Sequence, residues 1–262
     1  ICVQRTARAS FAPPASPKTY PPAASADEVC TGANFIAATP QGRLYATDGM
    51  GKAIVALEPD PEDGELRLIN KQSCAEIHDF PCHIDFTKDG RWALTAAYMD
   101  GTVAVWPIDP ATGELGACTD TKKQCLRDPN PSLADRQEQA HAHQVLLDPF
   151  QNKWALVCDL GTDMVYVYEL DTRRGSLSGA SDAARHLRLK EGSGPRHLDY
   201  HPSGRFVYIT CELSGEVVCA AFDQASGTLS QLSAVNALPD GVTCCRKGTC
   251  KIVERACEEG SG

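Results

Sequence analysis

"PRHLDYHPSGRFVYITCELSGEVVCAAFD", residues 195–223, holds three apolar or alternating segments separated by "HPSG" and "LSG". Glycine in such breaks supplies the positive φ that tight hairpin turns demand. Alternation of apolar and polar residues predicts strands with one face buried. The segment therefore predicts three consecutive β-strands, the last of which ends in an acid.

Three further segments repeat this pattern, with Gly42, Gly90, Gln151 and Gly204 as the equivalent turn positions. They are "ANFIAATPQGRLYATDGMGKAIVALEPD" (33–60), "PCHIDFTKDGRWALTAAYMDGTVAVWPID" (81–109) and "AHQVLLDPFQNKWALVCDLGTDMVYVYELD" (142–171). A turn and a fourth short strand follow each repeat, in "PEDGELRLI", "PATGELGAC", "TRRGSLSGA" and "QASGTLSQL". Four strands in a repeat of about 45 residues are typical of a β-propeller blade. We predict an all-β propeller with about four blades in this chain.

Composition and charge argue against several classes of partner and against a disulfide-bonded protein. The 262 residues carry a formal net charge of −9 and no basic stripe, which argues against a nucleic-acid partner. No apolar run approaches the roughly 20 residues of a membrane span, so no membrane partner is expected. Thirteen cysteines, an odd number scattered along the chain, favour free thiols in a reducing compartment over a disulfide framework.

The two ends of the chain differ in composition from its middle. Segment 1–30 is rich in Pro and Ala, 31–239 holds the blades, and 240–262 is a Cys-rich tail. The first segment is typical of a linker or a transit-peptide remnant, and a start at Ile1 indicates a processed or partial chain. We expect a cytoplasmic protein, or an organellar one if the transit-peptide interpretation holds. The tail lacks the paired C-x₂-C motifs of a zinc site, and no metal is expected at Cys244, Cys245, Cys250 and Cys257.

The third and fourth repeats resemble the lactonase family of seven-bladed propellers, which includes 6-phosphogluconolactonases and carboxy-cis,cis-muconate cyclases. The resemblance rests on "HAHQVLLDP" (141–149), "DLGTDMVYVYELD" (159–171), "GSGPRHLDYHPSGRFVY" (192–208) and "CEL" (211–213). It extends more weakly over residues 33–239, and it implies a chain truncated at both ends. A seven-bladed lactonase-type fold is therefore the expected architecture.

Several polar side chains are candidates from the residues alone. His141 and His143 are two positions apart and would share a strand face, as a metal pair, a base with an orienting neighbour, or a polar strand entry. Arg196 begins a strand where a blade meets the central channel, next to His197, and suits an anionic ligand or a salt bridge. Glu212 can lie beside Arg196 on the neighbouring strand.

Three more residues have structural explanations. His201 lies in a turn, and we interpret it as structural. Asp159 and Asp163 flank a glycine turn that accounts for them. The turn does not exclude a second role for the two aspartates. Together with His141 and His197, they are the expected substrate-binding residues.

The resemblance implies a catalytic role for His143, Arg196 and Glu212. In a lactone hydrolase resembling 6-phosphogluconolactonase, His143 would be the general base for water, and Arg196 would stabilise charge or hold the substrate's anion. Glu212 would orient Arg196 or pass a proton. A muconate-type cyclase could use the same groups for proton transfer, so a sugar lactone and a dicarboxylate both stay open as substrates. The resemblance implies no metal or organic cofactor.

A different class of function is also open. A four-blade arc would expose strand edges that proteins usually cover. A non-catalytic scaffold whose partner protein covers these edges is the alternative to an enzyme. A WD-repeat scaffold is disfavoured, because the upstream G-H element is absent.

Overall fold

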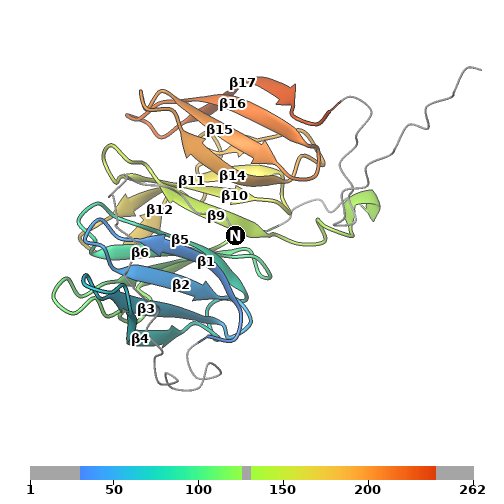
Figure 1. The fold of residues 1–262 in the computed structure, drawn as a ribbon. Helices are drawn as coiled ribbons and strands as arrows, with labels where there is room; N and C mark the ends of the chain where they lie inside the picture. The colour runs from blue at the N-terminus through green and yellow to red at the C-terminus, as the bar shows by residue number, and fades with distance from the viewer. Residues whose placement is uncertain (1–29, 126–130, 240–262) are drawn as a thin grey trace, which may run out of the picture.

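The computed structural model describes residues 30–125 and 131–239. Within these ranges the predicted all-β propeller is confirmed, as four antiparallel sheets of consecutive strands that follow one another along the molecule (Figure 1). The described part contains no helix long and apolar enough to cross a membrane. The predicted segment 1–30, except Cys30, and the tail 240–262 lie outside the described residues.

The first two sheets form blades 1 and 2. Blade 1 comprises β1 (Ala33–Ala38), β2 (Leu44–Asp48), β3 (Ala53–Pro59) and β4 (Leu66–Ser73). Blade 2 comprises β5 (Pro81–Phe86), β6 (Trp92–Ala97), β7 (Thr102–Pro107) and β8 (Asp120–Lys123). A short 3₁₀ helix, Pro131–Leu133, lies in the connection from blade 2 to blade 3.

The last two sheets form blades 3 and 4. Blade 3 comprises β9 (Ala142–Leu147), β10 (Trp154–Asp159), β11 (Met164–Asp171), β12 (Ser176–Ser178) and the short β13 (Leu187–Arg188), which also pairs with β11. Blade 4 comprises β14 (Pro195–Tyr200), β15 (Phe206–Cys211), β16 (Glu216–Phe222) and β17 (Leu229–Asn236). The first strands of the four blades, β1, β5, β9 and β14, lie next to one another in turn.

A hydrophobic core fills each space between neighbouring blades. Tyr45 and Trp106 are fully buried between blades 1 and 2, and Trp154 is buried between blades 3 and 4. Cys158 and Cys211 belong to the latter core, as expected of small apolar side chains. Strand β10 is buried along its whole length, because blades pack on both of its faces. The blades therefore form one continuous stack.

The blades are also locked together at one end of their strands. Nε1 of Trp92, at the start of β6, donates a hydrogen bond to the carbonyl of Thr172 in the next blade (2.8 Å). Trp154 makes the same bond to Gln224 (2.8 Å). Each acceptor lies in a turn that closes with a glycine of positive φ, Gly175 or Gly227. A Cβ on Gly227 would lie 2.6 Å from the Trp154 ring, and one on Gly175 would overlap Trp92.

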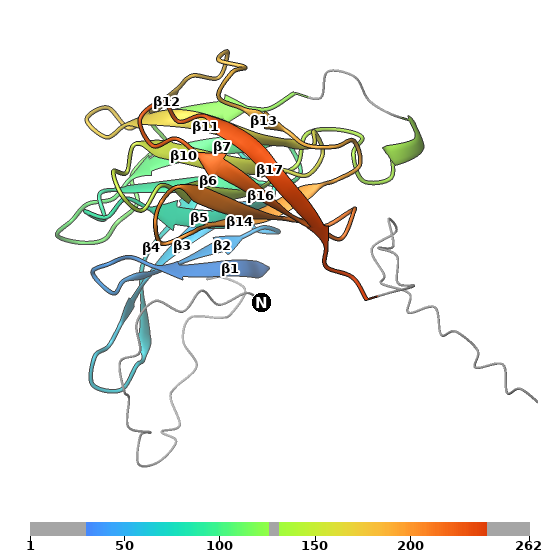
Figure 2. The ribbon, with the colours of Figure 1, turned by 90° about the horizontal axis from the view of Figure 1, so that it is seen from above.

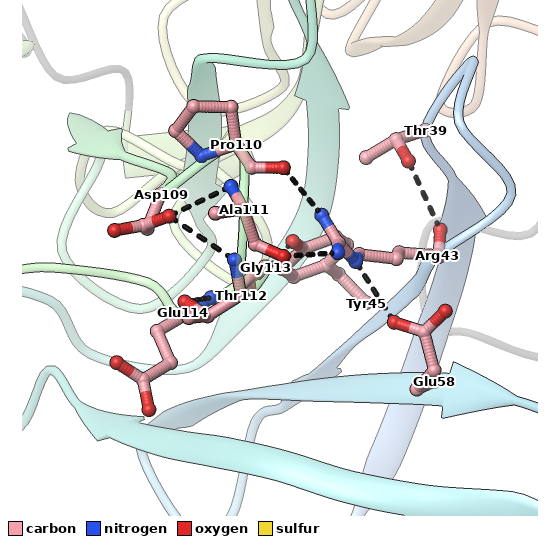
Figure 3. Close-up of polar contacts among 10 residues, drawn as sticks. All are labelled: Thr39, Arg43, Tyr45, Glu58, Asp109, Pro110, Ala111, Thr112, Gly113 and Glu114. Atoms are coloured by element: carbon pink, nitrogen blue, oxygen red, sulfur yellow. Dashed lines mark hydrogen bonds and ion pairs between the residues drawn. The ribbon is translucent and has the colours of Figure 1, made fainter.

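Between blades 1 and 2 the contact is made by Arg43 (Figure 3), one position before Leu44, which is the equivalent of the tryptophan. Its Nη1 and Nη2 donate to the carbonyls of Pro110 (3.1 Å) and Ala111 (2.9 Å), and its Nε pairs with Glu58 (2.8 Å). Tyr45 donates its hydroxyl proton to the carbonyl of Gly113 in the same turn (2.7 Å). The same lock thus recurs with different side chains.

One predicted turn equivalence is wrong by a residue. The positive φ that Gly42, Gly90 and Gly204 supply falls in blade 3 on Asn152 (φ 54°), not on Gln151. Asparagine tolerates the left-handed region better than most residues, so it replaces glycine there.

The contact between a large side chain and the glycine turn of the next blade predicts that two glycine substitutions destabilise the protein by different amounts. Gly175 and Gly64 occupy equivalent turns with similar φ (63° and 76°), but a Cβ on Gly64 meets nothing within 4 Å. Gly64→Ala should lower the free energy of unfolding by about 1 kcal/mol, through backbone strain alone. Gly175→Ala should lower it by about 2–4 kcal/mol, because the methyl group also displaces Trp92. Urea denaturation measures both, and equal losses would contradict the lock.

Candidate active site at the innermost strands

The four innermost strands share a β-bulge near their first residues. In β9, Ala142 pairs with Asp159 and Gln144 with Cys158, so His143 is the extra residue. In β14, Pro195 pairs with Cys211 and His197 with Thr210, so Arg196 is the extra residue. Asn34 in β1 and Cys82 in β5 occupy the same position. Bulges re-aim side chains and are frequent beside active sites. Two of the predicted catalytic residues are therefore presented by the same device on neighbouring strands.

Three histidines from three blades gather beside these bulges. The ring centroids of His143 and His197 are 5.1 Å apart, and those of His197 and His83 are 6.2 Å apart. Phe35 of β1 packs on His83 at 4.1 Å. Nδ1 of His83 and of His143 is buried without a hydrogen-bond partner among the described residues. A buried polar atom of this kind indicates a place for ordered water or a polar ligand.

These imidazoles are held in the neutral form. Burial, and after it the positive charge of Arg196, lowers the pKa of His143 to about 3, while Glu212 opposes the shift. Burial and Arg196 likewise lower the pKa of His197 to about 4. The pKa of His83 is also well below its ordinary value, mainly through burial. The three imidazoles are therefore uncharged at neutral pH, and the positive charge near them resides on the neighbouring arginines.

Glu212 and Arg196 form the predicted ion pair, between Oε2 of Glu212 and Nη1 of Arg196. The carboxylate has a second partner that the sequence did not indicate, since Oε1 accepts a hydrogen bond from Nη2 of Arg136 (2.6 Å). Burial opposes ionisation of Glu212, but the two guanidinium groups outweigh it and hold its pKa below the ordinary value. Glu212 follows the end of β15, so it lies in the turn rather than in the strand.

His141 lies just before β9 and does not share a regular strand face with His143, because the bulge interrupts the alternation. Its ring stacks on Tyr98 at 4.3 Å, and its Nδ1 donates to the Tyr98 carbonyl (2.7 Å). The Tyr98 ring also contacts the edge of His143 at 5.6 Å. His141 thus supports Tyr98, which in turn borders His143.

The two predicted aspartates bind backbone groups. Asp159 is fully buried and accepts hydrogen bonds from the amides of His141 and Thr162 (both 3.0 Å). Burial raises its pKa to about 6, although these bonds oppose the shift. Asp163 accepts hydrogen bonds from the amides of Gly192 and Gly194 (both 2.7 Å). Gly194 lies two positions before Arg196. These contacts give Asp159 and Asp163 positioning roles in the turns around the site.

Four residues of this cluster were missed from the sequence: Cys82, His83, Tyr98 and Arg136. Aligning "PCH" (81–83) with "PRH" (195–197) could have found the first two, since both motifs begin an innermost strand. Burial raises the pKa of the Cys82 thiol to about 12, which disfavours the nucleophilic thiolate. Its Sγ lies 3.4 Å from the carbonyl oxygen of His143. Arg136 lies in a connection without a motif.

No group of three or more His, Cys, Asp or Glu side chains in the described ranges could hold a metal ion. A cavity of about 680 Å³ lies elsewhere, between the end of blade 2 and the outer part of blade 3. Tyr166, Tyr168 and His186 line it, and none of the three predicted catalytic residues does. The candidate site is thus defined by its side-chain cluster rather than by this cavity.

The low pKa of His143 predicts a pH-dependent stability. Its ordinary value of 6.5 applies in the unfolded chain, so between pH 6.5 and about 3 the unfolded chain binds a proton that the folded protein does not. The free energy of unfolding therefore falls as the pH is lowered through this interval. His143→Asn should reduce that slope by up to about 1.4 kcal/mol per pH unit in urea denaturation. An unchanged slope would contradict a neutral, buried His143.

Known proteins are similar to this chain in sequence. A 6-phosphogluconolactonase of Bacillus subtilis (strain 168) is 30% identical over 200 residues, 76% of this chain and 53% of that protein. A 6-phosphogluconolactonase of Formosa agariphila is 29% identical over 212 residues, 78% of this chain and 56% of that protein. The chain thus spans about half the length of these relatives.

Solved structures and a family model agree with these relatives. The periplasmic gluconolactonase of Pseudomonas aeruginosa superposes with a TM-score of 0.70 at 29% identity, over 80% of this chain and 60% of that one. Residues 22–252 match the model of the family described as lactonase, 7-bladed β-propeller. The chain therefore belongs to the seven-bladed β-propeller lactonase family.

Proposed function

We propose that the site at the innermost strands hydrolyses a sugar lactone, as the names of the relatives suggest. The observation that carries the proposal is the presentation of His143 and Arg196 by equivalent bulges on adjacent strands, with Glu212 bound to Arg196. Neutral imidazole and fixed guanidinium are the two groups that water attack on an ester carbonyl needs.

In this mechanism His143 takes a proton from water as the water oxygen attacks the lactone carbonyl carbon. Arg196 stabilises the negative charge that develops on the carbonyl oxygen. The ring C–O bond then breaks, and the proton passes from His143 to the leaving oxygen, which gives a hydroxy acid. Glu212 holds the guanidinium of Arg196 in place through their ion pair.

The low pKa of His143 fits this role only when an anion is present. Arg196 contributes to that low value by opposing a second positive charge. A bound anion, or the oxyanion formed during the reaction, offsets the charge of Arg196 and raises the basicity of His143. Burial remains the larger cause of the low pKa of His143, so substrate makes His143 a stronger base than it is in the empty site by removing the contribution of Arg196.

The test is hydrolysis of 6-phosphogluconolactone by the purified chain, corrected for the spontaneous reaction. His143→Asn should lower kcat/KM by about 10²–10⁴-fold through loss of the base. Arg196→Gln should lower kcat by about 10²–10³-fold through loss of charge stabilisation.

His201→Asn is the matched control, because His201 lies in a hairpin turn and its Nδ1 contacts Ser203 (2.8 Å). It should retain the activity of the unsubstituted chain. Absence of enzymatic hydrolysis in a folded sample, or activity that survives His143→Asn, would overturn the proposal.

A second candidate function is a propeller scaffold, for which the outer face of blade 4 provides the observation. Tyr208, Leu232 and Val235 expose 41%, 57% and 65% of their surface. Among the described strands, none covers β16 and β17 when the molecule is viewed from above (Figure 2). Apolar exposure on a sheet face is typical of an interaction surface. We propose that a second copy of this chain packs here, through the same face of its own blade 4.

Sedimentation velocity tests the scaffold. The chain should associate as its concentration rises, and Val235→Asp should weaken association because a charge on the packed face opposes burial. Met99→Asp, at a residue 47% exposed in a turn of blade 2, is the matched control. A monomer at every concentration would count against this function.

A further inference from the structure

Arg136 brings a second guanidinium into the site from a distant part of the chain. It lies in the connection between β8 and β9, whereas Glu212 and Arg196 belong to blade 4. The two arginines bind different oxygens of one carboxylate, with Arg136 on Oε1 (2.6 Å) and Arg196 on Oε2. Glu212 therefore holds two guanidinium groups beside each other, although like charges would otherwise move apart.

The backbone around Arg136 is fixed. The amides of Arg136 and Gln137 both donate to the carbonyl of Leu133 (3.0 and 2.8 Å). The side-chain amide of Gln137 then donates to the carbonyl of Leu160 (2.7 Å) and to Asp163 (2.8 Å). These bonds attach the connection to blade 3, next to the turn that leads to Arg196. The position of Arg136 is thus set before any ligand binds.

The side chain of Arg136 is accessible as well as fixed. It is 22% exposed, and that of Arg196 is 43% exposed. Nη2 of Arg136 bonds Glu212 and lies 3.4 Å from the hydroxyl of Tyr98. A guanidinium group has five N–H donors, so donors remain for a further acceptor.

The charges of the described cluster do not cancel. Two guanidinium groups face one carboxylate, and the adjacent imidazoles of His143 and His197 are neutral. A partly desolvated site with excess positive charge and several fixed N–H donors is suited to an anion with more than one oxygen. Phosphate and carboxylate both have this chemistry.

We propose that Arg136 is a substrate-binding residue, which holds the phosphate or carboxylate group of an anionic lactone while Arg196 serves the reacting carbonyl. This inference rests on the proposed lactone hydrolysis. It assigns to Arg136 the choice between charged and neutral lactones, and it makes Glu212 the link that keeps the binding and reacting guanidinium groups together.

The test compares 6-phosphogluconolactone with glucono-δ-lactone, which has no anionic group. Arg136→Gln should raise KM for the phosphorylated lactone by on the order of 10–100-fold, since it removes a charged hydrogen bond. The ratio of kcat/KM for the phosphorylated over the neutral lactone should fall by a similar factor. Arg136→Lys should restore part of that ratio, because it keeps the charge but loses the planar fork.

Arg185→Gln is the matched control. Arg185 is 24% exposed and forms ion pairs with Glu169 and Asp182 outside the cluster, so its loss should leave the ratio unchanged. Equal losses on both lactones in Arg136→Gln would show a merely structural role and overturn the inference.

Calorimetric titration with the two hydrolysis products separates this inference from the proposed function. The unsubstituted chain should bind 6-phosphogluconate more tightly than gluconate, and Arg136→Gln should remove most of the difference. If the chain hydrolyses neither lactone yet shows this preference, the hydrolytic function fails and the anion site stands. If it binds the two products equally, the phosphate assignment fails. Equal binding of the two products, weakened alike by Arg136→Gln, would instead identify the carboxylate that both products share as the group that Arg136 holds.

Discussion

The contact between a large side chain of one blade and the glycine turn of the next determines how the blades stack. Trp92 and Trp154 each reach a turn carbonyl in the following blade, and only a glycine in that turn leaves room for the indole. Because the contact recurs at equivalent positions, the blades keep one relative orientation along the chain. The apolar cores then fill the space between them. The innermost strands are consequently adjacent, and the bulges at their other ends lie side by side.

The candidate site follows from that adjacency. No single blade contains it: His83, His143 and His197 come from blades 2, 3 and 4, and Arg136 comes from a connection between blades. Close packing also sets its electrostatics, because burial keeps the imidazoles neutral beside charged arginines. The positive charge can exist there because Glu212 is shared between two guanidinium groups.

Much of the fold and part of the site could be predicted from the sequence. The four repeats and their turns followed from alternation and glycine punctuation. The Arg196–Glu212 pair followed from the expected return of the chain beside Arg196, although Glu212 lies just past the end of the strand predicted for it. The pairing of His141 with His143 could not be judged, because a bulge breaks the two-residue period and leaves no mark in composition. Arg136 could not be found either, since nothing in an irregular connection indicates which blade it will meet.

The sequence by itself determined the blade, because strand alternation and turn chemistry act over a few residues and need no distant partner. It also determined the family, because each of the motifs that identify the family lies within a single repeat. The tertiary structure alone decided which side chains meet. Asp163 accepts hydrogen bonds from the amides of Gly192 and Gly194, about 30 positions along the chain, and Arg136 pairs with a carboxylate 76 positions away. Contacts between blades depend on how the sheets stack, and stacking is a property of the packed molecule rather than of any one segment.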